Sequence, residues 1–317
     1  MGLALITGVA GQDGSYLAEQ LLTAGQRVVG LVHPHESLPP YLTQVGGHSL
    51  CELIPCDIAD PGAFRRLLRS LSPSRVFHLA AVSSPAACQE NPTYSAKVNV
   101  TSVEVLMEWL SRDSPGSRAL VCSSAAVFGN QAAKCSERTP PSPLNEYGRQ
   151  KQVVRELAKQ ARDSGLFVAC AVPFNHESPR RPEEFVVAKV CQSAARIARG
   201  RQERLVLGDL EARRDWGYAP EYVTAMAWML DVDRPVELVL ATGKDHSVEE
   251  LVAAAFGCVG LDPQRCVASD PALKRADDPS VLVGDPSQAW LELGWEARTP
   301  FEELVGMMVD AALAALR

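Results

Sequence analysis

Tyr147 and Lys151 are four residues apart in a predicted helix, Glu146 to Arg162. Residues at positions i and i+4 share one face of a helix, so the phenol and the ammonium group should be neighbours. The ammonium charge favours the phenolate form, which makes Tyr147 a candidate proton acceptor near neutral pH. Ser124 follows a predicted strand, and its hydroxyl could hold the reacting oxygen beside Tyr147. The alternative is an accidental surface pair, but a glycine-rich turn upstream favours proton transfer.

That turn lies at the start of the chain. Gly8, Gly11 and Gly14 fall at three-residue intervals after the apolar run Leu3 to Ile6 and before a predicted helix, Ser15 to Thr23. Such a turn directs free backbone N–H groups and the positive end of the helix dipole at a bound anion. Glycine also lets the backbone approach a ligand without a Cβ in the way. Rather than an ordinary loop, we predict a dinucleotide site formed by Gly8, Gly11, Gln12, Asp13 and Gly14.

Further apolar runs predict that these groups are carried by a doubly wound parallel sheet in an α/β protein. The expected strands are 27–32, 52–55, 75–80, 118–123 and 167–172, with a helix over 92–109. Ligands of such sheets bind at the carboxyl ends of the strands. We therefore expect cofactor contacts at Asp57, Ile58, Leu79, Ala80 and Ala81, and a substrate contact at Ser83. Asp57 is equally well explained as a simple turn residue.

The pattern changes after residue 174. Helices are predicted at 184–197, 219–230, 248–256 and 301–316, with short strands at 205–207 and 236–241. We expect a cofactor-binding domain over 1–174 with a return at about 215–245, and a smaller substrate-binding portion over 175–317. Basic residues gather in this second part, which suits a phosphate-bearing ligand, although about half of them should be solvated surface charge: Arg180, Arg181, Lys189, Arg213, Arg214 and Arg275.

Composition excludes several other classes. The chain has 317 residues and a net charge of −7, which argues against nucleic acid as the main partner. No apolar run is long enough to span a bilayer, and Met1 leads directly into the first strand without room for a signal peptide. The nine cysteines are scattered without metal-site spacing, which is typical of reduced thiols. We expect a cytoplasmic protein with no metal and no membrane partner.

Two histidine positions need separate interpretation. The end of the second strand, where a carboxylate selects NAD and an arginine selects NADP, has Val32-His33-Pro34-His35-Glu36 and gives neither signal cleanly. His78 is flanked by apolar residues within a predicted strand, and we expect it to be a hydrogen-bonded core histidine.

With these stretches in view, the chain resembles the GDP-mannose 4,6-dehydratase family, within the extended short-chain dehydrogenases acting on nucleotide sugars. The similarity runs almost end to end. It rests on 4–22 (ALITGVAGQDGSYLAEQLL), 174–181 (FNHESPRR), 207–208 (LG), 214–217 (RDWG), 241–243 (ATG), 246–248 (HSV) and 284–286 (GDP).

The resemblance implies a modified Rossmann domain that binds NAD or NADP, a C-terminal portion that holds a GDP-sugar, and a homodimer formed through 92–109 and 146–162. It implies nucleotide contacts at Asn175, Lys189, Arg214, Arg275 and Asp278. Ser124, Tyr147 and Lys151 would be the catalytic set, and Phe185 would pack near the base.

Two departures from the family pattern bear on function. The dehydratase loop Ser-Thr-Ser-Glu-Leu-Tyr-Gly, aligned on Gly129, has Ser124 for its threonine and Ala126 for its glutamate. That glutamate is the acid/base group of the elimination, and such groups contribute about 10²–10⁴ in rate. An arginine pair for the NADP phosphate is replaced by His33 and Pro34. The resemblance therefore favours NAD without excluding NADP, and oxidation at C4 without elimination.

The function that we predict is an NAD-dependent 4-epimerase of a GDP-sugar, because the loop after the fifth strand looks like that of UDP-galactose 4-epimerases. The main alternative is a 4-keto-6-deoxy-sugar reductase, followed by an active dehydratase that uses another acid/base group. GDP-fucose synthase fits less well, since its cysteine and histidine correspond to Ala126 and Arg180. A non-catalytic NAD(P)-binding regulator is the alternative of a different class. The sequence does not distinguish a hexose, a deoxyhexose or a longer sugar.

Overall fold

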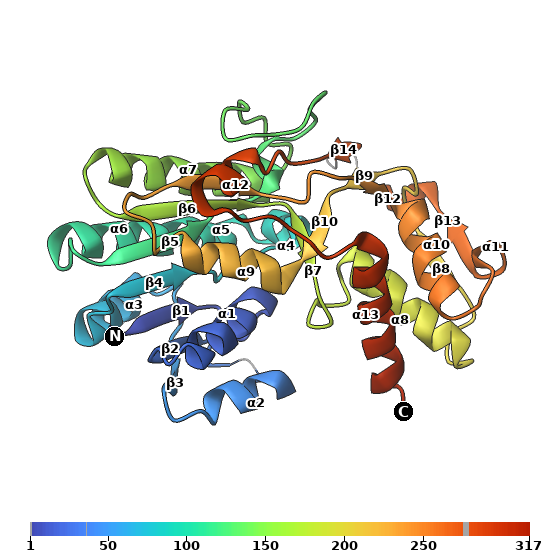
Figure 1. Ribbon diagram of the computed structural model, residues 1–317, viewed down its shortest axis with the longest axis horizontal. Helices are drawn as coiled ribbons and strands as arrows, with labels where there is room; N and C mark the ends of the chain where they lie inside the picture. Colours follow the sequence, from blue (N-terminus) through green and yellow to red (C-terminus); the bar gives the residue numbers. More distant parts are fainter. Residues whose placement is uncertain (1, 36, 275–278) are drawn as a thin grey trace.

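A seven-stranded parallel sheet forms the centre of the computed structural model, which describes residues 2–35, 37–274 and 279–317 (Figure 1). The strand order is β11-β6-β5-β4-β1-β2-β3, and every neighbouring pair is parallel. The strands are β1 (Ala4–Thr7), β2 (Val28–Val32), β3 (Cys51–Pro55), β4 (Arg75–His78), β5 (Arg118–Cys122), β6 (Val168–Pro173) and β11 (Glu237–Leu240). The predicted α/β class with a doubly wound parallel sheet is confirmed, with strand ends shifted by one or two residues.

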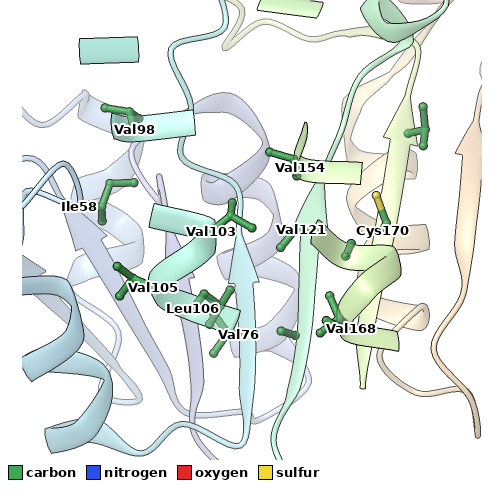
Figure 2. Close-up of a cluster of buried hydrophobic side chains, with 14 of the residues drawn as sticks. Ile58, Val76, Val98, Val103, Val105, Leu106, Val121, Val154, Val168 and Cys170 are labelled. Atoms are coloured by element: carbon green, nitrogen blue, oxygen red, sulfur yellow. The ribbon is translucent and has the colours of Figure 1, made fainter. Parts of the chain in front are cut away.

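Helices cover both faces of the sheet. On one face lie α1 (Gln12–Thr23), α2 (Pro40–Gly46) and α9 (Ala219–Trp228), and on the other α3 (Pro61–Leu71), α6 (Ser102–Arg112) and α7 (Glu146–Asp163). Because both faces are covered, strands such as β1 and β2 are buried along their whole length, as their uninterrupted apolar runs predict. Figure 2 shows the second face, where Val103 and Leu106 of α6 lie in one cluster with Val76 and Val121 of the sheet.

The predicted single helix over 92–109 is wrong in its middle. The chain forms α5 (Pro92–Ala96), then a π-helical turn (Lys97–Thr101), and only then α6. The extra residue in a π turn changes which side chains face inward, and such turns are frequent at functional sites. Here the turn contains Asn99, whose buried amide binds the backbone of Val82 on the loop after β4. A short helix in that loop, α4 (Pro85–Glu90), is capped by Ser84 and was not predicted.

The C-terminal portion has a core of its own, formed by α8 (Val186–Ala198), α10 (Val248–Cys258) and α13 (Phe301–Ala315). Three small sheets surround it: β7 with β10 (Asn175–Glu177, Trp216–Tyr218), β8 with β13 (Leu205–Leu207, Val267–Ser269), and β9 between β12 and β14 (Arg213–Arg214, His246–Ser247, Val281–Leu282). The remaining helices are α11 (Pro263–Cys266), α12 (Ser287–Leu293) and two 3-10 turns, Ala125–Val127 and Pro271–Leu273. Between these elements the chain returns to the main sheet to supply α9 and β11.

All nine cysteines lie within the described residues and are free. Among the helices that the structure describes, none is both long and apolar enough to cross a membrane. Over the same residues, no group of three or more His, Cys, Asp or Glu side chains could hold a metal ion.

The buried face of α6 supplies a test of the fold. Leu106 is fully buried in the cluster of Figure 2, whereas Leu291 on α12 is 71% exposed. Leu106→Ala should lower the free energy of unfolding by about 2–5 kcal/mol, because it removes buried methyl groups and leaves a cavity. Leu291→Ala should stay within about 0.5 kcal/mol of wild type. Urea unfolding followed by circular dichroism compares them, and equal midpoints would contradict this assignment of the core.

Candidate active site

One cleft of about 1360 Å³ lies at the carboxyl ends of the parallel strands, between the sheet and the C-terminal portion. Every predicted site residue that the structure describes lines this cleft. On the cofactor side these are Gly8, Gly11, Gln12, Asp13, Gly14, Asp57, Ile58, Leu79, Ala80 and Ala81. The predicted substrate contacts Ser83, Ser124, Asn175, Lys189 and Arg214 line it too, as do Tyr147 and Lys151, which were predicted to be catalytic and to contact the cofactor. Arg275 and Asp278, the other two predicted nucleotide contacts, lie outside the described residues.

The glycine turn between β1 and α1 has the tight geometry of a phosphate cradle. Gly8 has φ +71°, and a Cβ there would come within 2.8 Å of the Ala80 backbone. A Cβ at Gly14 would lie 2.2 Å from the carbonyl oxygen of Gly8. Helix α1 begins at Gln12, and no side chain caps its first turn. The N–H groups and the dipole of the first turn therefore face the cleft, and the residues present fit a dinucleotide pyrophosphate.

The side chains of Gln12 and Asp13 bind the segment that follows β6. Asp13 lies 2.9 Å from Nε2 of His176, and Gln12 donates to the His176 carbonyl oxygen and accepts from Ser178. Burial opposes both charges, but the charge and hydrogen bond of each partner outweigh it. The pKa of Asp13 is held below its usual value and the pKa of His176 above it. These two predicted cofactor residues thus also join the sheet domain to the C-terminal portion.

Tyr147 and Lys151 lie together on helix α7, as their spacing predicts. The Lys151 Nζ atom is 5.8 Å from the centre of the Tyr147 ring and donates to the carbonyl oxygen of Cys122 at 2.9 Å. The Ser123 hydroxyl donates to the Lys151 carbonyl oxygen at 2.9 Å. Helix α7 is therefore fixed to the end of β5. Ser124 is the next residue along the cleft, and its Oγ accepts from the backbone of Ala126 in the 3-10 turn.

Sequence reasoning missed a buried amide network behind this pair. Asn99 is 2% exposed; its amide accepts from Val82 N and donates to Val82 O and to Gln150 Oε1, at 2.8, 3.1 and 2.7 Å. Gln150, which precedes Lys151, in turn donates to Ser95 Oγ at 2.9 Å. These contacts position both the loop after β4 and helix α7. The only signal in the sequence is a polar residue on the apolar face of a predicted helix, and the π turn that buries it has no pattern of its own.

The end of β2 and the following strand carry three further residues of interest. His33 and His35 line the cleft with their rings edge to face, 5.8 Å apart. Asp57 accepts from Ala59 N at 2.8 Å, so it is a turn residue that also lines the cleft. Glu36 lies outside the described residues.

His78 is not a cleft residue: it is 4% exposed, contacts Thr7 and Ser102, and burial lowers its pKa to about 3. The prediction of a hydrogen-bonded core histidine is confirmed.

The predicted basic cluster divides into two groups. Lys189 and Arg214 line the cleft and donate to the carbonyl oxygens of Val206 and Arg213. Arg180 and Arg181 line the cleft as well and pair with Glu19 and Glu177, and Arg213 pairs with Asp245 and Glu250. Arg213 does not line the cleft. Arg213 is therefore one of the cluster members that belong to the surface charge, with its ion pairs on the β9–β12 side.

Phe185 also lines the cleft, at the N-terminal end of α8. The guanidinium of Arg181 stacks over this ring at 3.5 Å from its centre. A ring held by a cation on one side is a flat apolar surface of the kind on which a nucleobase stacks.

Comparisons with known proteins agree with this architecture. A family described as GDP-mannose 4,6 dehydratase matches residues 5–308. GDP-mannose 4,6 dehydratase 2 of Arabidopsis thaliana is 38% identical over 98% of this chain and 87% of its own length. A crystal structure of a putative epimerase from Burkholderia cenocepacia superposes with a TM-score of 0.83 at 28% identity, covering 98% of both chains. MoeE5 in complex with UDP-glucose and NAD superposes with a TM-score of 0.86 at 26% identity over both whole chains.

The matched family covers the glycine turn, the Tyr147 and Lys151 helix and nearly all of the C-terminal portion, and its curated relatives extend over the same range. The chain therefore belongs to the GDP-mannose 4,6-dehydratase family and is an enzyme of the extended short-chain dehydrogenases that act on nucleotide sugars.

Proposed function

We propose that this enzyme is an NAD-dependent 4-epimerase of a GDP-sugar. The observation that carries the proposal is Ala126, which lines the cleft two residues after Ser124, where the dehydratase pattern has its acid/base glutamate. A methyl group can neither remove the proton at C5 nor help expel the C6 hydroxyl. The chemistry that remains is proton and hydride movement at C4.

No neighbouring carboxylate replaces the missing one in the described part of the cleft. The acidic residues among its described lining are Asp13, Asp57, Glu184 and Asp209, and none of them lies on the loop after β5 or on α7. Asp13 is bound to His176, Asp57 to the turn after β3, and Asp209 to Lys274 at 2.6 Å. Glu184 is an exposed residue beside Phe185, at the nucleotide end of the cleft.

The residues around Ser124 suit reversible oxidation of a hydroxyl. Tyr147 as a phenolate takes the proton of the C4 hydroxyl, and the Lys151 ammonium stabilises the negative charge on the phenolate. Ser124 donates a hydrogen bond to the same oxygen. NAD held at the glycine turn would accept the C4 hydride and would return it. When the 4-keto sugar has rotated to present its other face, Tyr147 gives the proton back and the C4 hydroxyl forms with the opposite configuration.

The nucleotide side of the cleft suits a sugar that must turn while its carrier stays in place. Lys189 and Arg214 are cationic groups in the wall, and Phe185 offers a stacking surface for the base. Anchoring through the diphosphate leaves the hexose free to rotate. Membership of the GDP-mannose dehydratase family supports GDP as the carrier, and the complex of MoeE5 with NAD, together with His33 and Pro34 in place of the arginine pair, supports NAD.

The direct test uses the purified enzyme without added nicotinamide. Acid release should yield NAD(H), and NMR of a panel of GDP-sugars should show interconversion of C4 epimers. A strict need for added NADPH would contradict the epimerase proposal and favour the reductase. A 6-deoxy-4-keto product would favour the dehydratase.

Tyr147→Phe should lower kcat about 10²–10⁴-fold, because it removes only the group that moves the proton. Cofactor content should be unchanged, since the ring remains. Tyr218→Phe, on β10 and outside the cleft lining, is the matched control and should keep full activity. Full activity of the Tyr147 variant would refute its role as the proton acceptor.

Ala126→Glu should not restore dehydration. We expect elimination to stay about 100-fold or more slower than C4 turnover, because the surrounding side chains differ from the dehydratase pattern. Asn99 binds both the N–H and the carbonyl oxygen of Val82. The Sγ atom of Cys88 lies 3.3 Å from the same carbonyl oxygen.

Ala126→Gln serves as the neutral control of similar size, which separates crowding from acid/base chemistry. Rapid formation of a 6-deoxy-4-keto sugar by the glutamate variant alone would contradict the expectation.

A further inference from the structure

Arg180 reaches out of the C-terminal portion and contacts the cofactor side of the molecule. It follows β7 in a segment that runs toward α1 (Figure 1). Its guanidinium lies over two tyrosine rings, 3.9 Å from the centre of Tyr16 and 4.7 Å from the centre of Tyr41. Two further bonds of 3.0 and 2.6 Å fix it to Ser15 Oγ and Glu19 on α1.

One of these rings lines the cleft beside the glycine turn. Tyr41 belongs to α2, yet its hydroxyl donates to the carbonyl oxygen of Ala10 inside the glycine turn at 2.9 Å. Tyr41, Ala10 and Arg180 all line the cleft. The ring therefore connects the segment after β2 with the turn after β1, which are the two loops that hold the adenosine and the pyrophosphate in a fold of this kind.

Burial of the Arg180 guanidinium costs hydration free energy, which indicates that its contacts have a specific role. Its side chain is only 15% exposed, although arginine is normally well hydrated. The ion pair with Glu19 and the two cation–π contacts offset that loss of hydration. All of these partners belong to the sheet domain, while Arg180 belongs to the segment that also carries Asn175 and His176. The Tyr41 segment can therefore move away from the glycine turn only if the contact between Tyr41 and Arg180 breaks.

We propose that Arg180 is a positioning residue that holds Tyr41 against the glycine turn and so slows the release of bound NAD(H). The inference rests on the proposed function only in that NAD(H) binds this cleft. An epimerase has use for such a device, because the same cofactor must stay bound between two hydride transfers. A reductase must exchange its cofactor in every turnover.

The experiment measures cofactor dissociation and does not depend on catalysis. The full-length enzyme is loaded with NADH and mixed with a large excess of NAD⁺, and the loss of bound-NADH fluorescence is followed by stopped flow. Arg180→Met keeps the length of the side chain but removes its charge and planar group, and should speed release by about tenfold or more. Arg180→Lys keeps the charge opposite Glu19 and should lie between Arg180→Met and wild type.

Tyr41→Phe tests the second half of the contact. It keeps the ring beneath Arg180 but loses the bond to Ala10, and should also release NADH faster than wild type. The matched control is Arg112→Met on α6, where an exposed arginine pairs with Glu108. Its release rate should equal that of the wild type. A thermal melt of each variant measures any loss of stability separately.

Unchanged NADH release from both Arg180→Met and Tyr41→Phe would overturn the proposal. So would a release rate that rises in proportion to the drop in melting temperature across all variants, with Arg112→Met included. Rapid release in the two variants together with wild-type melting temperatures supports it. A wild-type enzyme that binds NADH but does not epimerise GDP-sugars would refute the proposed function and leave the release rates as the test of Arg180. Failure to bind NADH would overturn both.

Discussion

Two hydrogen bonds between helix α7 and the end of β5 fix the catalytic end of the cleft. Lys151 donates to the Cys122 carbonyl oxygen, and Ser123 donates to the Lys151 carbonyl oxygen. Lys151 as a residue is only 5% exposed, and a charged side chain in such a place needs hydrogen bonds to satisfy it. These bonds also fix Tyr147, which lies one turn before Lys151 on α7, and Ser124, which directly follows Ser123. The proton acceptor, its charge partner and the hydroxyl donor thus share one rigid frame.

The two halves of the cleft are held together by polar contacts. Their apolar cores are separate, with the core of α8, α10 and α13 distinct from the two that flank the sheet. Between them lie the Asp13–His176 ion pair, the bonds of Gln12, and Arg180 with its partners on α1. All of these contacts come from the first two turns of α1 and the segment 174–181. The helix proposed to receive the pyrophosphate is therefore also one of the bridges to the C-terminal portion.

The sequence predicted what depends on local pattern. Buried parallel strands, the glycine turn and the i, i+4 spacing of Tyr147 and Lys151 each have a signature that the fold reproduces. The π turn at Asn99 could not be foreseen, because an extra residue in a helix is set by long-range bonds to Val82 and Gln150. The contacts of Arg180 could not be foreseen either, because its partners Glu19 and Tyr41 are more than 130 residues away in the chain. The homodimer, the domain limits and the roles of individual site residues stay predictions.

The return of the chain to its sheet has a consequence for protein engineering. Strand β11 pairs along the edge of β6, but it is encoded after much of the C-terminal portion. A fragment cut at residue 174 would leave the row of backbone groups on β6 open to intermolecular pairing. Chimaeras with relatives of different sugar specificity must therefore keep β11 with the scaffold of β6, together with Ala289 and Trp295, which pack into the core on the same side of the sheet.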